Sequence, residues 1–299
     1  MTDPLITPRQ LVRWAEQCFR EADLYYGHGT DNPFDEAVYL VLRALALPFD
    51  VDDAVLDAPI TGEERRRVMV LVERRIQLRL PVAYLINEAW FSGLPFYVDE
   101  RVLVPRSPIA ELIEERFSPW LQESAITRIL DIGTGSGCIA VACALAFPHA
   151  RVDAVDSSSA ALAVADRNIV HYQLSDRVRL LQSDLYAALG AQRYDVIVAN
   201  PPYVSANELS HLPPEYRHEP LPALHAGEGG LAVVRRLLTH TRPHLEGHGV
   251  LIVEVGNRQD AVSQAFPDLP FIWLEFERGG EGVFLLRATD LAHSSAFAD

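Results

Sequence analysis

The residues Asn200, Pro201, Pro202 and Tyr203 follow directly after the apolar run 196–199, which reads as a buried strand. Proline is a poor strand residue because it lacks the N–H that a sheet needs, and it pushes the preceding residue toward extended geometry. We therefore expect a stiff, extended loop that offers carbonyl oxygens and one side-chain amide but few backbone donors. Such a loop is suited to receive a group that donates hydrogen bonds.

A second set of chemically promising residues follows the ends of three earlier predicted strands. Gly133, Gly135 and Gly137 form a glycine turn, Asp156 ends the next strand, and Asp184 follows the one after it. In open α/β sheets, ligands bind at the carboxyl ends of the strands, where Asp156 could accept both hydroxyls of a ribose and Asp184 could reach an adenine amino group. The glycines read G-x-G-x-G and not G-x-G-x-x-G, so NAD is not supported. Close packing of a helix and a helix cap are the structural alternatives for the glycines and Asp156.

The elements that must position these residues begin near residue 105, where strands and helices alternate. This alternation predicts a doubly wound, mostly parallel sheet. We expect strands at 128–132, 151–156, 178–182, 195–199, 249–255, 271–276 and 282–286. The last two are separated by a short turn, so they should form an antiparallel pair at the edge of the sheet.

The region before the sheet reads as helices. Thr7 with Gln10, and Thr61 with Glu64, have the spacing of capping boxes, and a further helix is expected at 34–47. The helix that begins at Thr61 carries six arginines, which we interpret as a solvated face in preference to a stripe that binds phosphate or RNA: Arg65, Arg66, Arg67, Arg74, Arg75 and Arg79.

Aromatic and β-branched residues around Gly93 and Pro95 predict a hairpin between the helices and the sheet. The expected organisation is therefore a helical domain at 1–85, a β-hairpin linker at 86–104 and a sheet domain at 105–299.

Composition restricts the function of this 299-residue chain. Its net charge of −15 should repel nucleic acid and anionic membranes and favours a basic partner. Cys18, Cys138 and Cys143 match neither a disulfide framework nor a metal site, and we expect Cys138 and Cys143 in the core. The N-terminus lacks the apolar centre of a signal peptide, and no apolar run approaches membrane-spanning length, so a cytoplasmic protein is expected.

The motifs D-I-G-T-G-S-G at 131–137 and A-N-P-P-Y at 199–203 resemble those of class I methyltransferases that use S-adenosylmethionine, in particular HemK-type protein-glutamine N5-methyltransferases. The resemblance covers nearly the whole chain. It implies a Rossmann-like, seven-stranded mixed sheet preceded by a small helical domain and a hairpin linker, with S-adenosylhomocysteine as a product. The cofactor-binding residues that it implies are Asp131, Gly133, Thr134, Gly135, Gly137, Asp156, Asp184, Leu185 and Asn200.

Two further stretches, YGHGTDNPFDEAV at 26–38 and VPRSPIAELI at 104–113, resemble one branch of this family. Members of that branch methylate a glutamine of large-subunit ribosomal protein L three, and a sister branch acts on translation release factors. The resemblance therefore implies ribosomal protein L three, free before assembly, as the partner, with release factors as the alternative. Residues 26–38 are the expected docking surface, and no membrane or DNA partner is expected.

The resemblance also implies a mechanism. A glutamine ends in a planar NH2 that donates two hydrogen bonds, and its nitrogen is poorly nucleophilic because the lone pair is shared with the carbonyl. Asn200 Oδ1 and the Pro201 carbonyl would accept both hydrogens and stabilise positive charge on the nitrogen. Tyr203 would stack on the amide, and Pro202 would complete the substrate-binding loop. The implied catalytic residues are thus Asn200, Pro201 and Tyr203.

Two other interpretations remain. Enzymes that methylate the amino groups of adenine or guanine share the Asn-Pro-Pro-aromatic motif, but the net charge of −15 and the lack of a dedicated DNA-reading domain argue against them. A non-catalytic S-adenosylmethionine-binding or ribosome-assembly protein would not need a loop that accepts an NH2 group.

Overall fold

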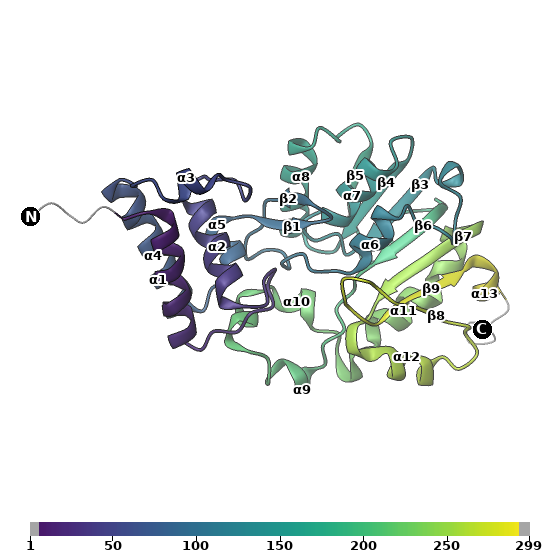
Figure 1. The fold of residues 1–299 in the computed structure, drawn as a ribbon. Coiled ribbons are helices and arrows are strands. Elements are labelled where there is room, and N and C mark those ends of the chain that lie inside the picture. The colour runs from purple at the N-terminus through teal and green to yellow at the C-terminus, as the bar shows by residue number, and fades with distance from the viewer. Residues whose placement is uncertain (1–5, 293–299) are drawn as a thin grey trace, which may run out of the picture. The chain divides into compact units, whose positions relative to one another are not determined.

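The computed structural model describes residues 6–292, and these form two compact units that are described separately (Figure 1). The helical unit contains the residues up to Ala89 together with Val98–Glu100 and Pro213–His218, and the sheet unit contains Trp90–Tyr97, Arg101–Leu212 and the residues from Glu219 onward. No pattern in the sequence predicts that Pro213–His218 packs with the helices.

Side-chain caps start the main helices of the helical unit. Thr7 and Gln10 form the predicted capping box of α1 (Pro8–Glu21), and Thr61 and Glu64 form that of α4 (Gly62–Leu78). The other elements of this unit are α2 (Pro33–Ala44), α3 (Asp53–Leu56), α5 (Val82–Ile86) and the 3-10 helix η2 (Pro214–His218). Both predicted helix starts are confirmed.

Arg75 of α4 contradicts the prediction of a solvated arginine face. It is only 1% exposed and lies on the same buried face as Val68 and Val72. Its Nε donates to Glu36 over 2.7 Å, and its Nη1 lies 3.4 Å from a carboxylate oxygen of Glu215. The prediction was wrong here because two buried carboxylates, distant in sequence, compensate the guanidinium inside the unit.

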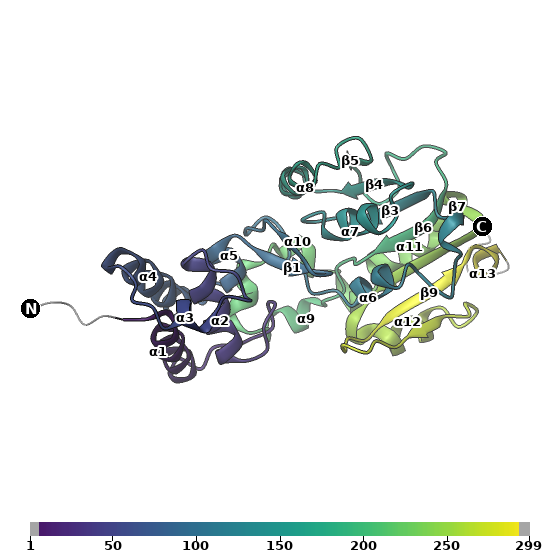
Figure 2. The ribbon, with the colours of Figure 1, turned by 45° about the horizontal axis from the view of Figure 1, so that its top comes forward.

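Seven strands make up the sheet in the described part of the chain, in the order β5-β4-β3-β6-β7-β9-β8 (Figure 2). Their bounds are β3 (Arg128–Ile132), β4 (Arg151–Asp156), β5 (Val178–Gln182), β6 (Tyr194–Ala199), β7 (Leu245–Glu254), β8 (Ile272–Leu274) and β9 (Val283–Arg287). Strands β3 to β7 pair in parallel, and β9 pairs antiparallel with both β7 and β8. The predicted mixed sheet with an antiparallel edge is confirmed.

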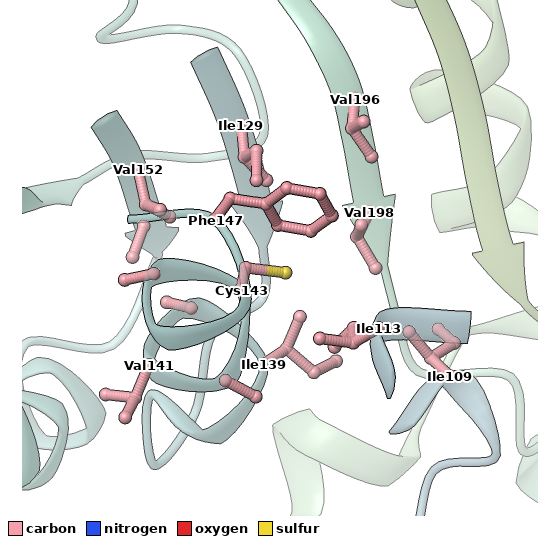
Figure 3. Packing of buried hydrophobic residues seen from close by; sticks show 14 of the residues in the cluster. Ile109, Ile113, Ile129, Ile139, Val141, Cys143, Phe147, Val152, Val196 and Val198 are labelled. Atoms are coloured by element: carbon pink, nitrogen blue, oxygen red, sulfur yellow. The ribbon is translucent and has the colours of Figure 1, made fainter. Parts of the chain in front are cut away.

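Helices cover both faces of this sheet. One face packs against α6 (Ile109–Glu114), α7 (Cys138–Ala146) and α8 (Ser159–His171), and the other against α11 (Ala232–Thr241), α12 (Gln259–Ala265) and α13 (Ala288–Ala292). Figure 3 shows Cys143 and Phe147 pointing from α7 and its C-terminal end toward the strands, and Ile139 pointing toward Ile113 of α6. Cys138 and Cys143 are buried in this core, as predicted.

Shorter elements complete the chain. β1 (Ala89–Phe91) and β2 (Leu94–Phe96) form the predicted hairpin, and Ser92 and Gly93 between them both have the positive φ of a tight hairpin turn. The remaining elements are α9 (Ala206–Leu209), α10 (Leu221–Leu224), η1 (Glu123–Ala125), η3 (Glu228–Gly230), η4 (Arg242–His244) and η5 (Gly256–Arg258). Among residues 6–292, no helix combines the length and apolar character needed to cross a bilayer.

Candidate active site

A cavity of about 520 Å³ lies in the sheet unit, lined by the segments that follow β3, β4, β5 and β6. This volume is typical of a site for a small organic ligand. The predicted site residues that line it are Gly133, Thr134, Gly135, Asp156, Asp184, Leu185, Asn200, Pro201 and Pro202. The structure thus brings together the glycine turn at 133–137, the carboxylates of Asp156 and Asp184, and the loop at 200–203, called the proline loop below. The parallel strands place the segments that follow them at the same edge of the sheet.

The glycine turn is fixed against the end of β4. The backbone N–H groups of Gly133 and Thr134 both donate to the Val155 carbonyl, over 2.9 and 3.0 Å. The N–H of Gly135 donates to Asp156 Oδ2 over 3.0 Å. These three bonds hold the turn at the mouth of the cavity, with its backbone exposed to a ligand.

Two predicted cofactor residues, Gly137 and Asp131, do not line the cavity. Gly137 precedes α7 with a φ of +79°, and a Cβ on it would lie 3.2 Å from the Cβ of Ala165 in α8, so it permits the two helices to pack closely. Asp131 is fully buried; its Oδ2 accepts from the Thr134 hydroxyl over 2.6 Å, and its Oδ1 has no hydrogen-bond partner among the described residues. Burial raises the pKa of Asp131 to about 7.

Asp156 does not cap α8, because the cap is Ser158, whose hydroxyl accepts from the Ala161 N–H; Asp156 instead supports the turn before this helix and lines the cavity. Its Oδ1 accepts from the N–H of Ser158, the residue that caps α8, over 2.9 Å, while its Oδ2 holds Gly135. A carboxylate oxygen can accept more than one hydrogen bond, so these contacts leave acceptor capacity toward the cavity.

The segment after β5 presents Asp184 and Leu185 to the cavity. Asp184 Oδ2 accepts from Arg236 Nη2 over 2.8 Å, and Leu185 has a φ of +51°. Ser183 holds this turn: its hydroxyl donates to the Leu185 carbonyl over 2.8 Å. Arg236, on α11, also lines the cavity and was not predicted from the sequence.

Glu254 is a second residue that sequence reasoning missed. It ends β7, and because Ala199 pairs with Val253, it lies beside Asn200 in the register of the two strands. Glu254 is 6% exposed, and its Oε2 lies 2.5 Å from Ser107 Oγ. Burial raises its pKa to about 7, opposed by hydrogen bonds from Ser107, Asn200 and Tyr203 and by the charge of Arg106.

Tyr203 does not line the cavity. Its ring packs against Gly256, where an added Cβ would lie 2.6 Å from Tyr203 Cε2, and its hydroxyl bonds Glu254. Burial raises its pKa to about 12, and the Glu254 carboxylate adds to this effect. Stacking of Tyr203 on a substrate amide therefore stays a prediction.

An ion pair between Arg106 and Glu219 holds in place the segment that contains Ser107, which lines the cavity. Arg106 Nη1 and Nη2 donate to the two oxygens of Glu219 over 2.6 and 2.8 Å, and the Val104 N–H donates to Oε1 over 3.0 Å. This bidentate pair is strong and directional. The stretch VPRSPIAELI contains Arg106 and Ser107, and it was the sequence signal that could have identified them as site residues.

The donors and acceptors around the cavity suit a nucleoside cofactor that carries hydroxyls and positive charge. Asp156 and Asp184 supply carboxylates, and Ile132, Ile139 and Val233 supply apolar walls. The residues present therefore fit the cofactor expected from the sequence. Within the described part of the chain, no group of three or more His, Cys, Asp or Glu side chains is arranged to hold a metal ion.

Comparisons with known proteins agree with this geometry. Residues 116–212 match the family model described as Methyltransferase small domain. The chain is 50% identical to the ribosomal protein uL3 glutamine methyltransferase of Bordetella pertussis, over 96% of this chain and 97% of the relative. It is 49% identical to that of Burkholderia pseudomallei, over 96% of each chain. A solved ribosomal protein L11 methylase from Lactobacillus delbrueckii subsp. bulgaricus is 20% identical, with a TM-score of 0.42 over 60% of this chain and 76% of that chain.

Proposed function

We propose that this chain, which belongs to the family of ribosomal protein uL3 glutamine methyltransferases, transfers a methyl group from S-adenosylmethionine to the side-chain amide nitrogen, N5, of a glutamine in uL3, the large-subunit ribosomal protein L three. One observation carries the proposal most directly: Asn200 and Pro201 line the same cavity as Gly135 and Asp156. A loop suited to an amide and a turn suited to a nucleoside thus share one space.

S-adenosylmethionine, when bound, supplies a methyl group on a positively charged sulfur, which makes the methyl carbon electrophilic. Asp156 would accept hydrogen bonds from ribose hydroxyls, and the backbone of the Gly133–Gly135 turn would lie against the amino-acid part. Asp184 and Leu185 would border the adenine. Asp131 would act through Thr134, which it holds in the turn.

Asn200 and Pro201 would act on the glutamine. Two acceptors, Asn200 Oδ1 and the Pro201 carbonyl, hold both N–H bonds of the substrate amide and favour the pyramidal nitrogen whose lone pair can attack. The prolines hold these acceptors in place before the substrate arrives, so little reorganisation is required. The methylated nitrogen carries a surplus proton, is strongly acidic, and releases that proton to water without a dedicated base.

Net charge supports free uL3 as the substrate, in the cytoplasm where ribosomes are assembled. An enzyme with a charge of −15 attracts a free basic ribosomal protein and is repelled by the anionic surface of an assembled subunit. The glutamine must also enter the cavity, which requires an extended or mobile segment.

The test is methyl transfer from labelled S-adenosylmethionine to free uL3, intact large subunits and release factors, at low and raised salt. We expect free uL3 to be methylated fastest, with a rate that falls as salt screens the attraction. Faster turnover on release factors would assign the chain to them instead. Equal turnover on intact subunits would remove the electrostatic argument.

Asn200→Ala tests the assigned chemistry in the same assay. Loss of one preorganised partner typically slows a reaction about 100- to 1,000-fold, so single-turnover methylation should fall by that factor. Calorimetry with S-adenosylhomocysteine should show nearly unchanged affinity. A near-normal rate in Asn200→Ala would contradict the role given to Asn200.

A further inference from the structure

Three groups that can donate hydrogen bonds lie next to the carboxylate of Glu254, and two of them belong to the proline loop. Ser107 Oγ bonds its carboxylate over 2.5 Å, and this carboxylate is buried at the end of β7. Asn200 lies beside Glu254 in the register of β6 and β7, and the Tyr203 hydroxyl also lies next to this carboxylate. Ser107 Oγ itself accepts from the Ile109 N–H over 3.2 Å, so the hydroxyl hydrogen of Ser107 is directed to Glu254. An ionised carboxylate only accepts hydrogen bonds, and each of these partners must therefore donate to it.

The need for a donor toward the Glu254 carboxylate determines the orientation of the Asn200 amide. The only donor in an asparagine side chain is its NH2, so a carboxylate beside Asn200 in the strand register favours Nδ2 toward β7 and Oδ1 directed away from Glu254. Asn200 lines the cavity, where Oδ1 is then available as an acceptor. The two ends of an amide are nearly equal in shape, and the hydrogen-bond network decides between them.

The opposite orientation would be unproductive. With Nδ2 toward the cavity, Asn200 would present a donor to the donor NH2 of a glutamine, and its Oδ1 would face the Glu254 carboxylate. Both contacts are repulsive. Without a partner for its NH2, the Asn200 amide would populate both orientations.

We propose, building on the proposed function, that Glu254 is a positioning residue that holds the Asn200 amide with Oδ1 toward the substrate. Ser107 and Tyr203 hold Glu254 in turn. Glu254 touches neither the substrate nor the cofactor and acts only through Asn200.

The ionisation of Glu254 bears on this role. A protonated carboxyl must donate its own hydrogen, which displaces one of the three donors. The charged and titratable groups around it are Arg106, whose charge favours ionisation, Tyr203, and Glu219, which Arg106 largely neutralises. Because the pKa of Glu254 is raised to about 7, methyl transfer should weaken as pH falls through this value.

The test compares Glu254→Gln, Asn200→Ala and the double variant in single-turnover methylation. We expect Glu254→Gln to slow transfer about 10- to 100-fold, with unchanged binding of S-adenosylhomocysteine, since it disturbs the orientation of one preorganised acceptor without removing it. The double variant should be no slower than Asn200→Ala, because residues that act as a unit are not additive. Glu246→Gln, a matched change elsewhere on β7, should behave as wild type. Additive losses, or a wild-type rate in Glu254→Gln, would overturn the proposal.

Two further readouts separate this proposal from the proposed function. The wild-type rate should rise with pH through about 7 and the Glu254→Gln rate should not. By NMR, the Asn200 side-chain NH2 should be protected from hydrogen exchange in the wild type and lose protection in Glu254→Gln, whatever the substrate. An unprotected NH2 in the wild type contradicts the role of Glu254 even if glutamine is methylated, and a protected NH2 supports it even if uL3 is not the substrate.

Discussion

At the scale of single residues, Asp156 serves the fold and the site together. It accepts the N–H of Ser158 at the start of α8 and the N–H of Gly135 in the glycine turn. It also lines the cavity. Support of the turns after β3 and β4 and acceptance of ribose hydroxyls are therefore compatible roles for one carboxylate.

Asp156→Asn should weaken cofactor binding, because the charge is lost and the single amide oxygen can keep the bond from Ser158 but not also the bond from Gly135. Hydrogen bonds that involve a charged group contribute about 1.5–3 kcal/mol, so the dissociation constant of S-adenosylhomocysteine should rise about 10- to 150-fold. Calorimetry measures this change, and thermal unfolding checks that the variant is folded. Unchanged affinity would leave Asp156 with only its structural role in the turns after β3 and β4.

The raised pKa of Asp131 predicts that the free energy of unfolding depends on pH. Its pKa is raised from 3.8 to about 7 in the folded state, so the folded protein binds this proton more tightly than the unfolded chain. Its contribution to stability is fully present below pH 3.8 and is lost as pH rises through about 7. Relative to Asp131→Asn, the wild type should lose about 1.4 kcal/mol of unfolding free energy between about pH 6 and pH 8.

Urea unfolding of both proteins at the two pH values measures this difference. Glu254 and the other titratable groups are present in both proteins, so their contributions cancel. A difference between wild type and variant that is the same at both pH values would show that the Asp131 carboxyl is ionised throughout this range.

At the scale of elements, Gly137 joins α7 to α8. It combines a φ of +79° with a Cβ position 3.2 Å from the Ala165 Cβ, whereas Gly190 has a φ of +59° and open space around it. Gly137→Ala and Gly190→Ala therefore share the backbone strain, and Gly137→Ala alone adds a clash. We expect Gly137→Ala to lose about 1–3 kcal/mol more unfolding free energy than Gly190→Ala, as overpacked cores do. Equal losses would mean that α7 and α8 move apart at no cost.

The strand elements were predictable because each buried strand is a short apolar run between turn residues. β3, β4 and β5 begin and end at the predicted residues. β7 begins four residues earlier than expected, at Leu245, because its first part reads Glu246, Gly247 and His248, which are exposed or half-buried and lack an apolar pattern. Where one side of a strand is solvated, its composition no longer marks its start.

The site was only partly predictable for a different reason. Turn residues that touch the cavity follow their strands directly, so the motif positions indicated them. Glu254 and Ser107 meet Asn200 only through the sheet register and the fold of the segment 104–107, which separate stretches of sequence do not reveal. Asp131 and Gly137 belong to the motif but support the turn without lining the cavity.

At the scale of the whole molecule, Arg75 connects distant parts of the chain within the helical unit. It bonds Glu36 of α2, the Tyr25 carbonyl and Glu215. Glu215 lies in Pro213–His218, which continues from the segment that begins with Asn200 and Pro201. The network therefore ties the continuation of the proline loop into the helices.

Arg75→Met should be strongly destabilising, because it leaves the buried Glu36 without its cation and leaves Glu215 with Arg79 alone. Breaking a buried ion pair in this way costs about 3–5 kcal/mol. Arg74→Met, an exposed change on the same helix, is the control and should have little effect. Urea unfolding of both variants measures the loss, and equal stability would mean that Glu36 and Glu215 are protonated or solvated without Arg75.

The same network refines the docking surface expected at residues 26–38. His28 and Glu36 are buried, so part of this stretch supports the helical unit. Phe34 is 47% exposed, and Asp31 and Asp35 are also exposed. We propose that these three residues, one aromatic and two acidic, meet the basic substrate.

Fragmentation mass spectrometry of free uL3, after reaction with the purified enzyme and S-adenosylmethionine, shows directly whether a glutamine is the residue that is methylated. We expect one added methyl group, located on the side-chain amide of a glutamine, and about 100- to 1,000-fold slower formation of this product with Asn200→Ala. A methyl group on any other side chain, or modification of release factors in place of uL3, would contradict this expectation.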